Sequence, residues 1–97
     1  MDTKISIRVR YLGAFADAVP SKEETCELGV PIVSALIDHL IERNGEKFRR
    51  LMIDPSTGAL RSGTTLLVNG HRPEMKQALS DGDEVALLTP LAGGKSG

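Results

Sequence analysis

The sequence has few of the residues with which small proteins form disulfides, bind metals or stack on nucleic-acid bases. It has one cysteine, Cys26, among 97 residues, which excludes an intramolecular disulfide, a multi-cysteine zinc site and a cysteine-ligated iron–sulfur cluster. Its three aromatic residues, Tyr11, Phe15 and Phe48, are too few to stack a row of nucleic-acid bases. Because a lone cysteine is typical of a reducing compartment, we expect a cytoplasmic protein.

Neither charge nor hydrophobicity is concentrated in one part of the chain. Twelve Lys and Arg residues against thirteen Asp and Glu residues leave a net charge of −1, so we expect no nucleic-acid partner and no membrane partner. No export signal is visible, and no run of about 18 apolar residues occurs. The length suits one domain, and 40% hydrophobic residues allow folding without disulfides or metal.

Runs of apolar residues predict four strands. Residues 4–11 alternate strictly between apolar and polar, which predicts a strand with one buried face. Residues 23–28 alternate more weakly and predict a polar edge strand. Residues 64–68 form a β-branched and leucine run that stops at the tight-turn pair Asn69-Gly70. Residues 84–89 are apolar without alternation, which predicts a central strand covered on much of both faces.

One stretch of the chain has a clear helical period. It opens at Pro31 in the first turn and ends at Gly45, a left-handed cap. Its apolar stripe is wide enough to cover a sheet. The stripe consists of Ile32, Val33, Leu36, Ile37, Leu40 and Ile41. Phe48 and Leu51 predict one further amphipathic turn, and residues 14–19 predict a short helical turn before Pro20.

The order strand, strand, helix, strand, strand predicts an α+β domain with the β-grasp, or ubiquitin-like, arrangement. We expect a mixed sheet of four to five strands with one main helix packed on one face. The first and last strands would lie side by side and parallel, and the face with Lys4, Arg8 and Arg10 would be in water. Residues 1–90 would form this domain, and residues 91–97 a flexible C-terminal tail.

The titratable residues assemble no clear catalytic constellation. His39 is expected on the solvated flank of the helix and His71 in a turn. Cys26 could pair with a histidine as a nucleophile, but it alternates onto the apolar side of its strand, where cysteine packs as a small hydrophobe. Residues 81–84, Asp-Gly-Asp-Glu, could be taken for a calcium loop, yet they lack its distant bidentate glutamate and predict a tight turn. The scattered glycines, Gly13 among them, form no phosphate-binding loop. We therefore expect no catalytic residue, no metal ligand and no bound cofactor.

The C-terminal segment carries the most specific signal. After the last strand, Pro90-Leu91-Ala92 leads into the paired glycines Gly93-Gly94. Together with residues 8–13, the turn at residues 68–71 and above all residues 79–94, this ending resembles the family of ubiquitin-like sulfur carriers. The similarity runs from Ile5 to Gly94 and is closest to the small subunit of molybdopterin synthase. The thiamin sulfur carrier is a shorter relative, and short β-grasp modifiers of archaea share the same ending.

The resemblance implies a protein that is a substrate rather than an enzyme. Gly94 would be adenylated with ATP by an E1-like enzyme and converted to a thiocarboxylate. Gly93 would be its spacer, because glycine has no Cβ and can enter a narrow channel in extended form. The large subunit of molybdopterin synthase would then accept the tail, and the sulfur would pass to a pterin precursor of the molybdenum or tungsten cofactor.

The resemblance also implies which residues contact the partner. Leu12 and Leu88 would face it, and Leu91 and Ala92 would line the entering tail. For Leu88, ordinary core packing is the alternative to a partner contact. The two interpretations predict opposite exposure of this side chain in the folded protein.

Lys95-Ser96-Gly97 depart from the family pattern, which ends at the second glycine. We expect a precursor that is trimmed after Gly94 by a processing metallopeptidase. Two alternatives stay open: Gly97 itself is activated, or the extension blocks activation and the protein is a β-grasp binding module. A ubiquitin-like modifier joined through Gly94 to lysines of target proteins would use the same activation chemistry, so that function stays open as well.

Overall fold

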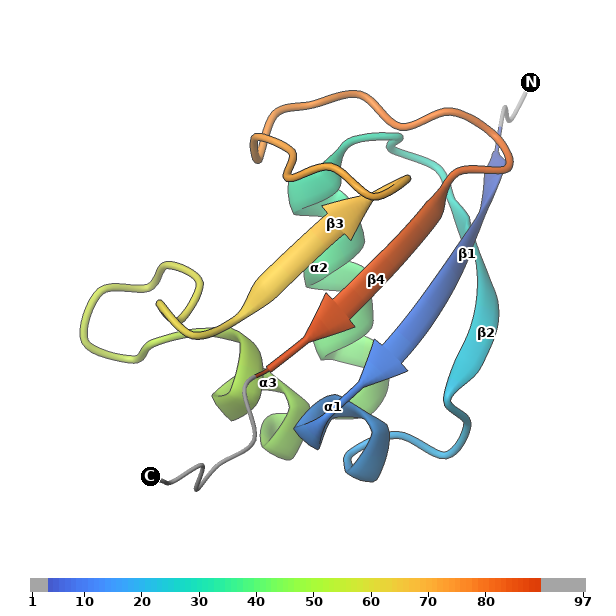
Figure 1. Ribbon diagram of the computed structural model, residues 1–97. Coiled ribbons are helices and arrows are strands. Elements are labelled where there is room, and N and C mark those ends of the chain that lie inside the picture. The colour runs from blue at the N-terminus through green and yellow to red at the C-terminus, as the bar shows by residue number, and fades with distance from the viewer. Residues whose placement is uncertain (1–3, 90–97) are drawn as a thin grey trace.

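Residues 4–89, which are the part of the chain that the computed structural model describes, form a mixed sheet with helices on one face (Figure 1). In this described part of the chain, the sheet has four strands in the order β2-β1-β4-β3. The strands are β1 (Ile5–Leu12), β2 (Glu23–Leu28), β3 (Thr65–Val68) and β4 (Glu84–Leu88). β1 and β4 run parallel at the centre, and each pairs with its outer neighbour in antiparallel fashion. The expected β-grasp arrangement is therefore confirmed.

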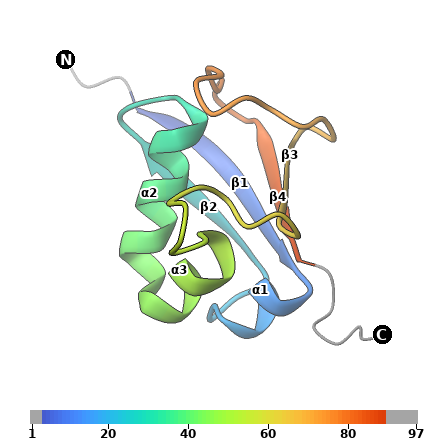
Figure 2. The same ribbon diagram turned by 90° about the vertical axis from the view of Figure 1, so that its left-hand side faces the viewer.

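Within residues 4–89, three helices accompany the sheet, and α2 and α3 cover one of its faces (Figure 2). They are α1 (Ala14–Asp17), α2 (Val33–Asn44) and α3 (Glu46–Met52). The apolar stripe of α2 is buried against the sheet, as its sequence period predicts. In the part of the chain that the structure describes, no helix is both long and apolar enough to cross a membrane.

The start of α2 differs from the prediction. Pro31 and Ile32 lie outside the helix, because Ile32 is extended and forms a bridge with Ala78. The first helical N–H groups need partners outside the helix, and the loop before β4 supplies them. Val33 and Ser34 donate their backbone N–H groups to the carbonyl oxygens of Gln77 and Met75, at 3.1 and 2.9 Å. This capping by a distant loop moves the helix start to Val33.

The core lies between the sheet and the helices, and aromatic rings fill the end where the central strands finish. Tyr11, Phe15 and Phe48 are all at most 1% exposed. The Phe48 ring meets Tyr11 edge to face with centroids 6.0 Å apart, and its centroid lies 5.3 Å from that of Phe15. Such geometries add to the stabilisation that burial of aromatic area provides. Phe48 on α3 therefore joins the helical layer to β1.

The prediction that β4 is covered on much of both faces is wrong, although its central position is confirmed. Val85 and Leu87 point into the core and are 0% exposed, whereas Leu88 points outward and is 40% exposed. Among residues 4–89 no helix packs on the outer face of the sheet (Figure 2). The apolar run arises because the outward positions of this strand hold Ala86 and Leu88 in addition to the core residues.

One polar network reaches into the edge of the core. Tyr11 donates its hydroxyl hydrogen to Glu24 Oε2, and Arg43 Nη2 lies 2.9 Å from Glu24 Oε1. Burial raises the pKa of Tyr11, and the hydrogen bond to Glu24 raises it further. Burial also raises the pKa of the Cys26 thiol, and the Glu24 carboxylate adds to this effect. Both groups are therefore held neutral by their surroundings.

These shifts predict that stability falls in alkaline solution. As the pH rises above about 8.5 for cysteine and about 10 for tyrosine, the unfolded chain loses these protons while the folded protein keeps them. The free energy of unfolding should then fall by up to about 1.4 kcal/mol per pH unit for each group. Urea unfolding across this range will measure the slope, and Cys26→Ala should reduce it. An unfolding free energy that stays constant up to pH ~10 would contradict the prediction.

Candidate docking site and chain exit

The outer face of the sheet carries an exposed apolar patch where the two central strands end. Leu12 and Leu88 are direct neighbours in the parallel register of β1 and β4, and each is 40% exposed. On the other side of β4, Thr65 pairs with Leu88 and Leu67 pairs with Ala86. Residues paired in register share a face of the sheet, so these side chains form one surface. We call it the exit patch; its members are Leu12, Leu88, Ala86, Leu67 and Thr65.

A row of charged side chains borders the exit patch on the same face. Arg10 Nη1 lies 3.3 Å from Glu84 Oε2, and Arg8 Nε lies 3.9 Å from Glu23 Oε2. All four side chains are at least 42% exposed, so these pairs add little to stability. An apolar centre with a charged rim is the composition of a protein–protein interface. Leu12 and Leu88 are exposed at this apolar centre, and their contact with a partner stays a prediction.

The position at which the chain leaves the domain adjoins the exit patch. Because β1 and β4 are parallel, both finish at the same edge of the sheet (Figure 1). Thr89 directly follows Leu88 and is buried, with 8% of its surface exposed. Ala14 donates its backbone N–H to Thr89 Oγ1 at 3.1 Å. The segment that begins at Pro90 therefore starts from a defined point beside Leu12 and Leu88.

The remaining predicted site residues belong to the C-terminal segment. Leu91, Ala92, Gly93 and Gly94 lie outside the described residues, as does the Lys95-Ser96-Gly97 extension. Their roles in lining the tail, spacing and activation stay predictions. The same holds for the predicted boundary between the domain and its tail.

Cys26 and the histidines are not brought together in the described region. Cys26 is 1% exposed on the inner face of β2, and its raised pKa opposes the thiolate that a nucleophile needs. His39 lies on α2 and is partly exposed, and His71 is exposed in the turn after β3. Within residues 4–89, no group of three or more His, Cys, Asp and Glu side chains could hold a metal ion.

The acidic turn at residues 81–84 has a structural use. Asp81 Oδ1 accepts the Ser6 backbone N–H at 2.7 Å, and Asp83 Oδ2 accepts the Ser80 backbone N–H at 2.8 Å. Asp83 Oδ1 also accepts a hydrogen bond from the Asn69 side chain at 3.0 Å. These carboxylates hold a tight turn that leads into β4, which confirms the turn prediction.

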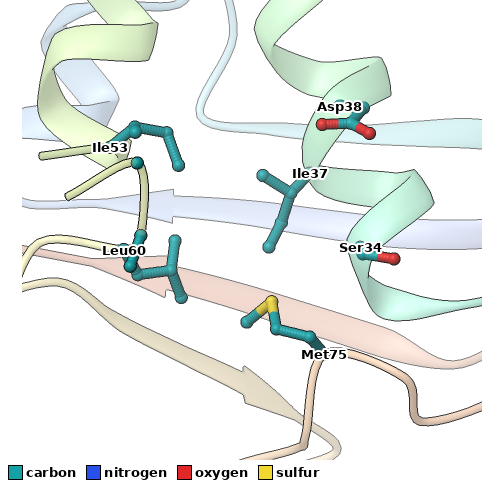
Figure 3. A pocket seen from close by; sticks show the side chains of 8 residues that line it. Ser34, Ile37, Asp38, Ile53, Leu60 and Met75 are labelled. Carbon is teal, nitrogen blue, oxygen red and sulfur yellow. The ribbon is translucent and has the colours of Figure 1, made fainter. Parts of the chain in front are cut away.

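A pocket of about 550 Å³ lies away from the exit patch, between α2 and two loops (Figure 3). Ile37, Ile53, Leu60 and Met75 give it an apolar lining. Its polar side chains are those of Ser34 and Asp38. A single carboxylate without a second titratable group in the lining does not make an acid–base pair.

Sequence reasoning missed two residues of the chain exit, Gly13 and Thr89. Gly13 has φ 63° and ψ −137°, a conformation that glycine adopts most readily. A Cβ at Gly13 would lie 2.6 Å from the Thr89 carbonyl oxygen, so the two backbones approach each other closely. The one sequence signal is a glycine two residues after the end of the strand predicted over residues 4–11. The contact between Gly13 and Thr89 can be recognised only once β1 and β4 are known to be neighbours.

Comparison with known proteins finds one matching sequence family and several solved structures with the same fold. The sequence model of the ThiS family matches residues 9–94. Small archaeal modifier protein 1 of Haloferax volcanii is 25% identical, with 91% of this chain and 98% of that chain covered and a TM-score of 0.77. A Pyrococcus furiosus protein provisionally named molybdopterin converting factor, subunit 1, is 26% identical, with 90% and 99% covered and a TM-score of 0.74. Small archaeal modifier protein 1 of Methanosarcina acetivorans, at 16% identity, 94% and 98% coverage and a TM-score of 0.78, shares the fold. No curated protein matches the sequence.

Proposed function

Because the chain belongs to the ThiS family, we propose that it is a sulfur carrier protein whose C-terminal Gly94 is activated and thiocarboxylated. The observation that carries this proposal is the exit patch, in which Leu12 and Leu88 lie exposed beside the point where the chain leaves β4. An enzyme that holds this patch also holds the start of the segment on which it acts. The protein would be a substrate of that enzyme, working in the reducing cytoplasm.

The activation has two steps. An oxygen of the Gly94 carboxylate attacks the α-phosphorus of ATP on an E1-like enzyme, and pyrophosphate leaves. A sulfur nucleophile then attacks the acyl carbon, and AMP leaves with one of the original carboxylate oxygens. Glycines at positions 93 and 94 leave this carbon unhindered, because neither carries a Cβ. The chain itself supplies the terminus and binds no cofactor.

We propose that the acceptor of the sulfur is a pterin precursor in molybdenum or tungsten cofactor synthesis. The large subunit of molybdopterin synthase would bind the exit patch and take the tail into its active site, with Leu91 and Ala92 along the channel. The likeness to the Pyrococcus furiosus protein, which carries the name of a molybdopterin converting factor subunit, supports this acceptor.

The residues after Gly94 must be removed for this chemistry. Lys95-Ser96-Gly97 follow the second glycine, and we propose that a metallopeptidase cleaves after Gly94. The alternative is activation of Gly97 itself. Intact mass of the protein from its native host separates the two, because a functional mature form that retains residues 95–97 contradicts the trimming.

The decisive experiment compares chains that end at Gly94 and at Gly97. Each is incubated with the E1-like enzyme of the same organism, ATP and a sulfide donor, and its mass is measured. We expect the Gly94 form alone to gain the mass of an oxygen-to-sulfur exchange, and a Gly94-ending chain with Gly93→Pro to gain little. If the Gly97 form reacts equally well, Gly97 is the activated residue. If neither form reacts, the protein is a binding module.

A second function, that of a ubiquitin-like protein modifier, is favoured by a specific observation. Small archaeal modifier protein 1 of Haloferax volcanii is 25% identical over nearly the full length of both chains. Conjugation would use the same Gly94 adenylate, with a lysine amine of a target protein as the nucleophile. Isopeptide-linked conjugates found by mass spectrometry support this function. A thiocarboxylate together with formation of the pterin dithiolene supports the carrier.

A further inference from the structure

We propose that Gly13, Ala14 and Thr89 form a clasp that fixes the direction in which the C-terminal segment leaves the domain. We call these three residues the exit clasp. The exit clasp positions Gly94 for reaction, whereas the exit patch provides binding. This inference rests on the proposed function, because it assigns a role in the activation of the same terminus.

The first contact of the exit clasp joins the Thr89 side chain to α1. Thr89 is a polar residue that is buried, at 8% exposure. Ala14 begins α1, so its backbone N–H has no partner within the helix. The Thr89 hydroxyl accepts this N–H at 3.1 Å, so a part-buried donor at the start of α1 is paired with the last described residue of the chain.

The second contact joins the backbone of Thr89 to Gly13. At φ 63° and ψ −137° the chain reverses after β1, and glycine tolerates this conformation. Since a Cβ at Gly13 would be 2.6 Å from the Thr89 carbonyl oxygen, only a residue without a side chain permits the approach. The carbonyl of Thr89 belongs to the peptide bond that leads into Pro90. The exit clasp thus combines a hydrogen bond to the Thr89 side chain with close packing of Gly13 against the Thr89 carbonyl oxygen.

The length of the tail explains why this direction matters. Gly94 follows Thr89 by five residues, which span about 17 Å when extended in a channel. A change of about 30° in exit direction would move the terminus by about 9 Å over that length. Reacting atoms must come within about 3.5 Å of one another, so such a change lowers the fraction of bound molecules that can react. Binding through the exit patch would be unaffected.

Two substitutions at Thr89, in the chain that ends at Gly94, test the proposal. Thr89→Val keeps the shape of the side chain but removes the acceptor, and Thr89→Ser keeps the hydroxyl. Adenylate formation with ATP and the E1-like enzyme is measured at varied carrier concentration. We expect Thr89→Val to lower kcat about tenfold with KM within about twofold of the wild-type value. Thr89→Ser should stay within about twofold in both constants.

A second readout does not depend on activity. We expect the order parameter of the Leu91 amide, measured by ¹⁵N relaxation, to be lower in Thr89→Val than in the wild type. The order parameters of β1 should be unchanged. If the wild-type chain is not adenylated, the proposed function fails while this measurement still tests the exit clasp. If Thr89→Val has the same kcat and the same relaxation as the wild type, the proposed role of the exit clasp is wrong. A rise in KM alone, or a Thr89→Ser variant as slow as Thr89→Val, overturns it as well.

Discussion

Replacing Leu88 by arginine is expected to abolish binding of the two proposed partners, the E1-like enzyme and the synthase large subunit. Leu88 is 40% exposed and lies beside Leu12 in the exit patch. We expect Leu88 to be a hot-spot contact that contributes about 2 kcal/mol or more, so its loss should weaken binding by about 30-fold or more. An arginine adds the cost of burying an unpaired charge. Calorimetric titration of the Gly94-ending chain with each partner measures the loss.

The folded domain should tolerate this substitution. Because the side chain already faces water, we expect the free energy of unfolding to change by no more than about 0.5 kcal/mol. Val30→Arg is the matched control, since Val30 is also apolar and is 58% exposed but lies outside the exit patch. Val30→Arg should leave both affinities unchanged. A large fall in melting temperature for Leu88→Arg would instead support the core interpretation of Leu88.

Truncation of Phe48 to alanine is expected to destabilise the domain severely. The side chain is 0% exposed and its ring contacts those of Tyr11 and Phe15. Removing a buried phenylalanine ring costs about 3–5 kcal/mol, because transfer energy is lost and a cavity remains. Domains of this size are stable by about 5–15 kcal/mol, so the variant would be near its unfolding threshold.

Urea unfolding at neutral pH measures the effect. Lys47→Ala is the control, because Lys47 is the exposed neighbour of Phe48 on α3 and should change the unfolding free energy by less than about 0.5 kcal/mol. A loss below about 1 kcal/mol for Phe48→Ala would show that the cluster of rings does not hold α3 to the sheet.

Local periodicity was sufficient to predict the elements of this fold. The alternation of residues 4–11 assigns Ile7, Val9 and Tyr11 to the core, and all three are at most 1% exposed. The stripe of α2 likewise depends only on residues three and four apart. Such patterns report which face of an element is buried, and the topology rules then leave few ways to pair the strands.

Features that depend on distant residues could not be predicted in the same way. Leu88 is exposed because no element in the described chain packs on the outer face, and a run of apolar letters does not report this. The contact between Ala14 and Thr89 arises from the parallel pairing of strands far apart in sequence. Helix α2 begins late because a loop before β4 caps it. In each case the feature depends on a contact, or the lack of one, between residues far apart in sequence. A short stretch of sequence does not contain that information.

The parallel pairing of β1 and β4 also determines how the protein can be handled in the laboratory. β1 begins at Ile5, at the opposite end of the sheet from the exit patch (Figure 1). Eight residues of strand separate the two ends by about 23 Å. A purification tag, fluorophore or surface anchor attached ahead of β1 therefore leaves the exit patch accessible. Under the proposed function, anything appended behind Gly94 would instead block the terminus that is activated, so an assay of the proposed carrier activity requires labels at the front of the chain.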